Sequence, residues 1–409
     1  MFFSKRVPPI ARDAYNKDAM AGMLSAVMGG LTLPFIIVIA RQTLNASPME
    51  VGLLTMAPAA GYLLSLPWAN VTLGRAKMPY AYYAWLISRS LFFLAIFATT
   101  SKLLVGIYVL YWLVAGAAIP PYTDIMKEIY PDRDRGKIMG FVRVLTSICS
   151  IVFALIAGVL LKYVSYRYVF PVAAIFGIVS AIIFKKIRMS APAKEEGVRL
   201  FPFLWDSVTV LFKDKGYLWF CGGIFLYGFA TYFVAPVFAL YEVDILHVGT
   251  VRQSVYTFVV SIFGMIGYFY WGTRLDRRRP EKIVAIQCVG WAMIPVIYLA
   301  ASNWWVLLPA KVLLGFVGAG NDLAYFMGVI YFAPRERLSQ YQAIFLTLIG
   351  IRGIIGPLSA GWLVEKNLLS TQSVFIICAV ATMVSVGVLM FGYRRYKPID
   401  NVNGEALTT

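Results

Sequence analysis

The chain has 409 residues, of which 60% are hydrophobic and only 14% are charged, and its mean hydropathy is +0.73. Soluble globular domains carry about 25% charged residues, so this composition excludes a water-soluble globule. The formal net charge of +17 raises nucleic acid as a partner. The aromatic side chains, however, lie in apolar stretches rather than among the basic patches, and no nucleic-acid partner is expected.

Twelve apolar stretches of about twenty residues follow one another along the chain. An α-helix rises 1.5 Å per residue, so about 20 residues cross the roughly 30 Å of hydrocarbon in a bilayer. The sequence therefore predicts an all-α polytopic membrane protein with twelve transmembrane helices. The predicted spans are 18–41, 51–73, 79–99, 103–126, 138–161, 166–187, 217–241, 253–273, 281–301, 304–331, 340–364 and 372–393.

Most cations fall in alternate connections between these spans. One set of connections holds 28 of the 37 Lys and Arg residues, and the opposite set holds six. Because loops rich in Lys and Arg resist translocation, the richer set is predicted to be cytoplasmic, with both termini on that side. The first apolar run lacks a small-residue cleavage site and is predicted to be a retained helix. The expected location is the cytoplasmic (inner) membrane of a bacterium, with the lipid bilayer as the surrounding partner.

The longest hydrophilic interval, about residues 188–215, lies between the sixth and seventh spans. It ends in the run LFPFLW at 200–205, which is typical of a short amphipathic helix on the membrane surface. The chain is thereby divided into six spans and six spans. The expected domains are an N-terminal six-helix bundle (1–187), a cytoplasmic linker with a short amphipathic helix (188–216), a C-terminal six-helix bundle (217–393) and a cytoplasmic tail (394–409).

The two halves are similar to each other at an offset of about 203 positions. This offset relates Trp68 to Trp271, the loop at Pro131 to the loop at Pro334 with a slip of one residue, and Ala157-Gly158 to Ala360-Gly361. Parallel repeats of six spans place a substrate site at their interface, near the bilayer midplane. The internal repeat therefore predicts a central site between the halves.

The loop after the eighth span carries the pattern G-x-x-x-D-R, with Gly272, Asp276 and Arg277 at its fixed positions. The run from Ile129 to Gly140 also matches a known connection between fourth and fifth spans. On these motifs the sequence resembles the major facilitator superfamily of secondary transporters, over nearly the whole chain. In the matching loop of the first half, Leu73 stands where the family has an Asp.

A second motif lies in the eleventh span, where Gly353-x-x-Gly356-Pro357 is followed by Gly361. It is similar to the Gly-Pro antiporter motif of that superfamily, which belongs in the fifth span. We interpret this copy as close helix packing with a proline bend. The resemblance implies two pseudo-symmetric six-helix bundles, a cavity lined by the first, fourth, seventh and tenth helices, and transport by alternating access.

Four ionisable residues lie well within the predicted spans: Arg89, Lys311, Asp322 and Arg352. Each costs at least about 2.5–3.5 kcal/mol in hydrocarbon unless it is paired or wetted. Lys311 and Asp322 are eleven residues apart and share one face of the tenth helix, with Gly315 and Gly318 between them. This stripe is typical of a helix that lines a cavity.

Two interpretations of these charges remain open. Asp322 and Arg352 either neutralise each other between adjacent helices or take part in binding solute or protons. Arg89 is either a structural cation of a peripheral helix or part of the pathway. Asp124, one turn from Glu128 and beside Arg135 and Arg143, indicates a cytoplasmic ion-pair network and is also a candidate proton carrier.

Candidate polar contacts for a solute are Asn321 and Tyr325 of the tenth span and Tyr227 and Tyr232 of the seventh. The proposed cytoplasmic gate comprises Gly272, Asp276, Arg277 and Arg143. In it, Asp276 pairs across the halves with Arg143 or Lys137 and the pair breaks on opening.

The remaining residue types argue against other classes of protein. The single histidine, His247, lies in a predicted outside loop, so no metal site or nucleophile–base pair assembles, and neither a metal, a cofactor nor an enzymatic activity is expected. The sequence has no phosphate-binding G-x-x-x-x-G-K-[ST] motif, so ATP is not the expected energy source.

We predict a monomeric secondary active transporter of a small solute, coupled to protons that Asp322 carries, as a symporter or antiporter. A lipid or amphiphile translocase with the same fold is the alternative, and a membrane-embedded enzyme is a weaker one.

Overall fold

The computed structural model describes residues 3–72, 74–189, 209, 211–275, 279–334 and 337–396. Within these ranges the chain forms helices joined by short turns, and none of the described residues belongs to a strand. The predicted amphipathic helix at 200–205 and most of the C-terminal tail lie outside the described residues.

The N-terminal bundle holds the first six spans. After two short 3-10 turns, η1 (Ser4–Arg6) and η2 (Pro9–Ala11), its helices are α1 (Arg12–Thr32), continued by η3 (Leu33–Phe35), α2 (Ile36–Val38) and η4 (Ile39–Thr43), then α3 (Pro48–Thr72), α4 (Lys77–Ser90) with η5 (Leu91–Phe97), α5 (Ser101–Gly116), α6 (Ile119–Ile129), α7 (Arg135–Tyr163) and α8 (Tyr166–Lys185).

The C-terminal bundle holds the other six. Its helices are α10 (Lys215–Leu240), continued by η6 (Tyr241–Ile245), then α11 (Thr250–Leu275), α12 (Pro280–Ala300), η7 (Trp304–Leu307) with α13 (Leu308–Phe332), α14 (Leu338–Glu365) and α15 (Thr371–Arg395).

These helices confirm the predicted fold class. Among the described residues, eleven helices are long and apolar enough to cross a membrane, and there are twelve if α5 and α6, bent by 41° at their junction, count as one span. The bend falls where Pro120 and Pro121 occupy the first turn of α6. Because proline has no N–H to donate to the preceding turn, α5 ends at Gly116 and the chain changes direction. Hydropathy alone had predicted one straight span over 103–126.

Each bundle has its own apolar core, and its outer surface is apolar too. One large buried cluster lies within α10 to α15, while separate clusters fill the N-terminal bundle. On α8 the exposed large side chains recur every three or four residues, at Tyr168, Val172, Ile175, Val179 and Ile182. An exposed apolar stripe at helical spacing suits contact with acyl chains, in agreement with the membrane assignment.

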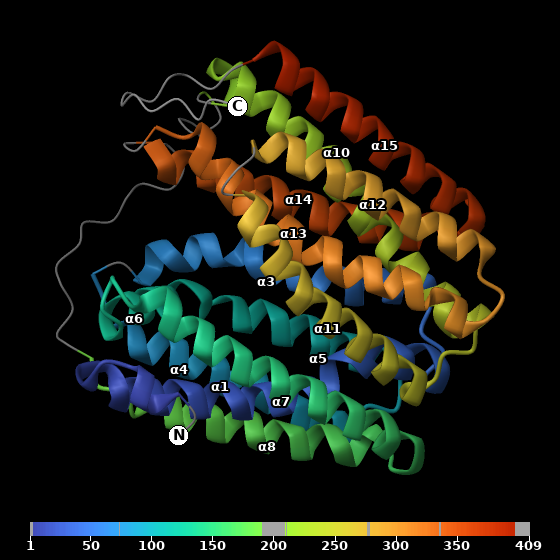
Figure 1. Cartoon of the computed structure of the whole chain (residues 1–409). Coiled ribbons are helices and arrows are strands. Elements are labelled where there is room, and N and C mark those ends of the chain that lie inside the picture. Colours follow the sequence, from blue (N-terminus) through green and yellow to red (C-terminus); the bar gives the residue numbers. More distant parts are fainter. Residues whose placement is uncertain are drawn as a thin grey trace.

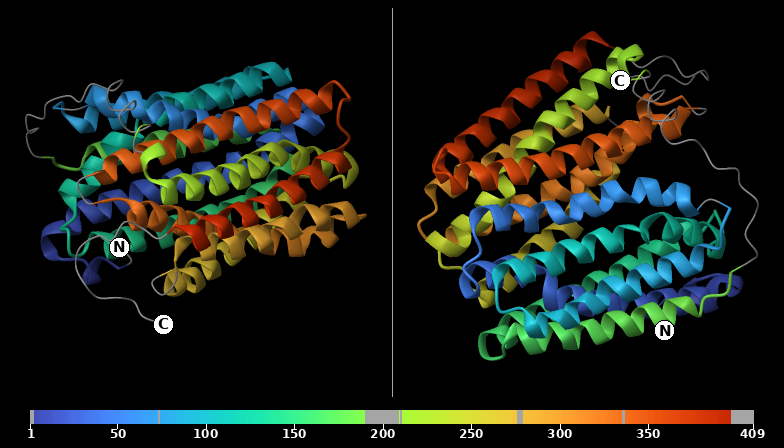
Figure 2. Two further views of the ribbon diagram at one scale, coloured as in Figure 1. Left: turned by 90° about the horizontal axis from the view of Figure 1, so that it is seen from above. Right: turned by 180° about the vertical axis from the view of Figure 1, so that it is seen from behind.

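The two bundles lie side by side and touch chiefly between α3 and α14 and between α7 and α11, with smaller contacts of α3 with α10, of η3 with α11 and of η4 with η6 (Figure 1). Seen from behind, the bundles converge at one end and diverge toward the other, the end at which α8 finishes and α10 begins (Figure 2). The convergent end carries the cation-poor loops around residues 44–47 and 246–249. We call it the outer end, after the orientation that the cation pattern predicts, and the opposite end the inner end.

The structure shows local features that repeat between the halves. Each first span ends in a π-helical turn, η4 or η6, followed by a residue with positive φ, Asn45 (54°) or His247 (50°). The backbone bond from Ala46 N to Ala40 O (2.8 Å) has its counterpart from Val248 N to Glu242 O (2.9 Å). The spacing of these features is close to the offset of 203 found in the sequence.

Two glycines of the repeat lie where the bundles touch. A Cβ at Gly158 of α7 would collide with Ser254 of α11, and a Cβ at Gly361 of α14 would approach the carbonyl oxygen of Pro48 at 2.8 Å. Glycine is needed at both positions because the backbone of the other bundle, or a side chain close to it, comes this near. The Ala-Gly pairs seen in the sequence therefore mark the two contacts between the bundles at the outer end.

Candidate functional site

Lys311 of α13 is paired with an acid that sequence reasoning missed. Its Nζ lies 2.6 Å from Glu242 Oε1, and both residues are buried, at 7% and 6% exposed. The Tyr298 hydroxyl donates to the same carboxylate oxygen, and the ammonium of Lys311 lies 4.5 Å from the ring centroid of Tyr256. Glu242 and Lys311 thus neutralise each other inside the protein, which offsets part of the cost of burying each charge.

The position of Glu242 explains why it was overlooked. The seventh span was predicted to end at residue 241, so Glu242 counted as part of an outside loop. In the structure the helix continues through η6 to Ile245 and carries Glu242 into the bundle. The sequence did offer one indication of Glu242. A lysine within an apolar run, such as Lys311, favours an acid at a similar depth on a neighbouring helix.

A cavity of about 340 Å³ adjoins this pair and lies between the bundles. The N-terminal bundle contributes Pro34, Ile37 and Val38 to its lining, and the C-terminal bundle contributes polar groups: Thr231, Tyr232, Glu242, Gln253 and Lys311. We call it the interface cavity. Tyr232, a predicted solute contact, therefore lies where both halves meet.

The structure does not bring Asp322 and Arg352 together. Asp322 is exposed, and its Oδ2 accepts a hydrogen bond of 2.7 Å from the hydroxyl of Tyr268 on α11. Within the described residues, no ion pair joins it to a cation. The interpretation of Asp322 and Arg352 as a mutually neutralising pair does not fit this geometry.

Arg352 of α14 is buried at 2% exposed. Its Nη1 donates to the carbonyl oxygen of Ile224 on α10, and its Cζ lies 5.5 Å from the ring centroid of Tyr325. The guanidinium occupies the space beside Gly228, where a Cβ would collide with it, and its Nε has no partner. Arg352 is a buried cation without a carboxylate among the described residues.

Asn321 and Tyr227 form a second polar group at this depth. The Asn321 amide nitrogen donates to the Tyr227 hydroxyl, while the amide oxygen of Asn321 is buried and has no partner. Tyr227 also packs edge-on against Trp291, at 5.9 Å between ring centroids. Three of the predicted solute contacts, Asn321, Tyr325 and Tyr227, therefore gather near Arg352 in the C-terminal bundle.

Arg89 of α4 lines a cavity of about 750 Å³ within the N-terminal bundle. Its Nη1 donates to Gly177 O (2.7 Å) and Ser180 Oγ (3.1 Å), and its Nη2 donates to Ser25 Oγ (3.0 Å). The lining includes two further charged residues, Asp18 and Arg143. We call this the Arg89 cavity. Arg89 is not a peripheral cation in contact with lipid.

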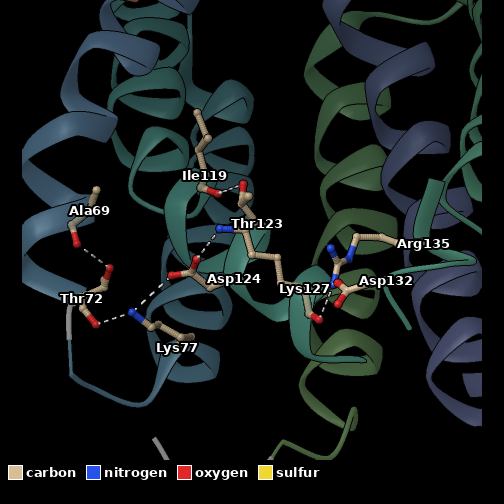
Figure 3. A network of polar contacts seen from close by, with 9 residues as sticks. All are labelled: Ala69, Thr72, Lys77, Ile119, Thr123, Asp124, Lys127, Asp132 and Arg135. Carbon is tan, nitrogen blue, oxygen red and sulfur yellow. Dashed lines mark hydrogen bonds and ion pairs between the residues drawn. The ribbon is translucent and has the colours of Figure 1, made fainter. Parts of the chain in front are cut away.

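Asp124 belongs to an ion-pair network at the inner end, drawn in Figure 3. Its carboxylate lies 3.2 Å from Lys77 Nζ at the start of α4 and 3.8 Å from Lys127 Nζ on its own helix. Lys77 also donates to Thr72 O (2.8 Å), and Arg135 pairs separately with Asp132. The predicted network is present, with Lys77 and Lys127 as the partners of Asp124 in place of Arg135 and Arg143.

The predicted gate can be described only in part. Asp276 and Arg277 lie outside the described residues, so their pairing with Arg143 or Lys137 stays a prediction. Gly272 lies near the inner end of α11 with open space around its Cα. Arg143 is exposed and lines the Arg89 cavity.

Polar contacts between the bundles close the outer end. Arg41 forms an ion pair with Asp244, at 2.9 Å from Nε to Oδ1 and 2.9 Å from Nη2 to Oδ2. Glu365 Oε2 accepts bonds from Ser47 Oγ (2.7 Å) and from the backbone N of Met49 (2.9 Å). Further contacts run from Gln42 Nε2 to Val248 O (3.2 Å) and from Thr250 Oγ1 to Gly158 O (2.9 Å). These polar contacts between described residues of the two bundles all lie at this end.

Comparisons with known proteins agree with this architecture. The family model of the Major Facilitator Superfamily matches residues 19–320 and 221–408. The hexuronate transporter of Bacillus subtilis (strain 168) is 21% identical over 428 aligned positions, which cover 92% of this chain and 95% of that protein.

Solved structures share the fold at low sequence identity. A mutant of the nucleoside transporter NupG superposes with a TM-score of 0.76 at 14% identity, covering 93% of this chain and 99% of that one. A bacterial homolog of the human lysosomal transporter Spinster, in an inward-facing and occupied conformation, gives 0.67 at 14% identity, covering 95% and 98%.

Fold, buried polar groups and relatives together define an integral multi-pass membrane protein that transports a small solute. The chain belongs to the Major Facilitator Superfamily.

Proposed function

We propose that the protein moves a small polar solute by alternating access, with the two six-helix bundles rocking about a central site. The observation that carries the proposal is the asymmetry of the bundle contacts. Arg41–Asp244 and the bonds of Glu365 join the bundles at the outer end, whereas the bundles diverge toward the inner end (Figure 2). Such an arrangement corresponds to a state that is closed outside and open inside.

Charged and hydroxyl groups in both cavities support a polar solute, although most of the lining around them is apolar. The Arg89 cavity is lined by hydroxyl groups of Ser25, Thr146, Ser147 and Ser150 besides its charged residues. Ligand sites generally place a few such groups within a cavity of about 300–1,000 Å³. A lipid or amphiphile translocase with the same fold is the second candidate, because apolar side chains make up much of the same lining. The protein acts as a monomer in this proposal, with both termini cytoplasmic in a bacterial inner membrane.

Energy for transport comes from protons in this proposal, and two carboxylates are suited to carry them. Asp322 is accessible and bonded to Tyr268, and Glu242 is buried and paired with Lys311. A carboxylate that alternates between wet and dry surroundings also alternates between ionised and neutral forms. Solute that moves in the same direction as the protons indicates symport, and solute that moves in the opposite direction indicates antiport.

A substrate-independent experiment tests alternating access. Ser147→Cys, in a Cys149→Ser background, places a thiol in the Arg89 cavity, and Arg41→Cys with Asp244→Cys allows a short thiol cross-linker to fix the outer end. In intact cells we expect an impermeant maleimide to label the thiol at position 147 slowly from outside and to stop labelling it after cross-linking. The same thiol should still be labelled from the inner side in inverted vesicles. Persistent outside labelling of the cross-linked protein would contradict the proposal.

Transport itself is tested in proteoliposomes. We expect an imposed pH gradient to drive accumulation of a radiolabelled solute, and a protonophore to abolish it. Accumulation that does not depend on the pH gradient would contradict proton coupling, and it would not contradict alternating access.

A further inference from the structure

Arg89 is a buried cation whose charge the protein does not neutralise. Only 6% of the residue is exposed, and its three hydrogen bonds go to neutral oxygens: one carbonyl and two hydroxyls. No ion pair joins it to any carboxylate among the described residues. Lys311, buried to the same degree, has Glu242 at 2.6 Å. Of the three buried cations Arg89, Lys311 and Arg352, only Lys311 therefore has a carboxylate partner among the described residues.

The bonds of Arg89 leave part of its guanidinium free. An arginine has five N–H groups in a planar fork, and Gly177, Ser180 and Ser25 accept from three of them. Within the part of the chain that the structure describes, the Nε–H and one Nη2–H are left over. Two N–H groups on one guanidinium are the number that a carboxylate binds in its bidentate mode.

The space beside Arg89 is a cavity of about 750 Å³, large enough for a sugar-sized molecule. Its wall continues from Arg89 to Arg143 through the hydroxyl groups of Thr146, Ser147 and Ser150 on α7. Trp85 closes one side, with its ring centroid 5.0 Å from the guanidinium carbon of Arg89. Hydroxyl groups along one helix and a cation at the end offer partners for a polyhydroxylated acid.

Charges around the cavity favour an anion. Arg89 and Arg143 contribute two positive charges, and Asp18 is the one acid in the lining. The Asp18 carboxylate is occupied by the hydroxyl of Tyr130, which donates to its Oδ2 at 2.7 Å. The lining thus carries a net positive charge in a region of low dielectric constant, where an unpaired charge attracts a counter-charge strongly.

We propose that the Arg89 cavity binds a small polyhydroxylated organic acid, and that the guanidinium of Arg89 binds the carboxylate of that acid. The inference rests on the proposed transport function and names its substrate class. On this view the protein completes the ion pair of Arg89 only when solute is bound.

Binding to the purified full-length protein tests this directly, with calorimetry as the readout. The probes are D-glucuronate, its uncharged methyl ester, D-glucose and D-glucose 6-phosphate. We expect glucuronate to bind at least about tenfold more tightly than the ester or glucose, as expected for a charge-assisted bidentate bond. Glucose 6-phosphate binding more tightly than glucuronate would overturn the assignment of a carboxylate.

Variants separate charge recognition from a structural role. Arg89→Gln should weaken glucuronate at least about tenfold and leave the weak binding of the ester unchanged, with Arg89→Lys in between. Arg12→Gln, which removes an exposed cation of α1, is the matched control and should bind like the wild type. If Arg89→Gln does not fold, the comparison of glucuronate with its ester in the wild type decides alone.

The proposal is overturned if charge makes no difference in the wild type, if a folded Arg89→Gln protein keeps full affinity for glucuronate, or if glucuronate does not bind. None of these results affects the thiol-labelling test of alternating access, which uses no substrate. Failure of the substrate assignment and failure of the transport mechanism are therefore distinguishable.

Discussion

Asp322 and Glu242 lie in opposite surroundings although both belong to the C-terminal bundle. Asp322 is exposed and has a tyrosine hydroxyl for a partner, while Glu242 is buried and has a cation. A solvated acid exchanges protons freely, whereas a buried and paired acid releases its cation only when it is protonated. The two acids are therefore suited to different steps of a coupled cycle.

Replacing Asp322 by Asn should uncouple transport from protons. We expect Asp322→Asn to abolish gradient-driven accumulation and to retain exchange of labelled for unlabelled solute, because exchange needs no net proton movement. Proteoliposomes measured in both modes provide the readout, with Tyr268→Phe as the variant that removes only the hydrogen bond. Normal accumulation by Asp322→Asn would exclude Asp322 as the proton carrier.

The buried pair makes a separate prediction about stability. Lys311→Met leaves Glu242 buried without its cation, and breaking a buried pair in this way costs about 3–5 kcal/mol. We expect a clearly lower unfolding temperature for Lys311→Met and for Glu242→Gln, and recovery of most of the loss in the double variant, which buries no charge. Asp13→Asn, at an exposed acid paired with Lys17, is the matched control and should leave the unfolding temperature nearly unchanged. Additive losses in the double variant would show that the two residues are not energetically paired.

The sequence was enough to identify the buried charged residues of the candidate site, but not the residues that they contact. Lys311, Arg352 and Arg89 stood out because a cation within an apolar run is rare, and all three are buried. Their partners depend on which helices face each other and on where a helix ends. Glu242 was missed because the apolar run stops one residue before it, while the π-helical turn continues to Ile245.

At the scale of helices, the spans were predictable because an apolar run of fixed length has few structures available in a bilayer. The departures have local causes, as at Pro120 and Pro121, which divide the fourth span. The internal repeat was visible as two Ala-Gly pairs, yet only the structure shows that Gly158 and Gly361 lie where one bundle contacts the other.

The close helix contacts at Gly158 and Gly361 lead to a prediction about closure of the outer end. Gly158→Val should hinder closure, because even a Cβ collides with Ser254, and Gly361→Val should act in the same way through Pro48. We expect either change to raise the rate at which the thiol of the Ser147→Cys protein is labelled from outside. Gly106→Val is the matched control, since nothing lies within 4 Å of a Cβ at that position. Equal labelling rates in all three variants would show that close packing at Gly158 and Gly361 does not control closure of the outer end.

At the scale of the whole molecule, the orientation in the membrane and the state of the bundles are linked. Among the described residues, the loops rich in Lys and Arg lie at the end where the bundles diverge. If those loops are cytoplasmic, the conformation is open to the cytoplasm. The outer end must then open before solute can enter from outside. The polar contacts at that end therefore influence the equilibrium between the state open to the cytoplasm and the state open to the outside.

The ion pair between Arg41 and Asp244 provides the last prediction, because it joins equivalent regions of the two halves, η4 and η6. Arg41→Asp places two acids face to face at the outer end and should favour the state open to the outside. Asp244→Arg should do the same with two cations. The double variant restores an ion pair of reversed polarity and should return outside labelling of the thiol at position 147 to the rate seen with the native pair. Because the pair is partly exposed, the single changes should alter that rate by several-fold rather than abolish closure, and high salt should reduce the difference. If the double variant behaves like either single one, a local effect of each substitution, and not the contact between the bundles, governs access from outside.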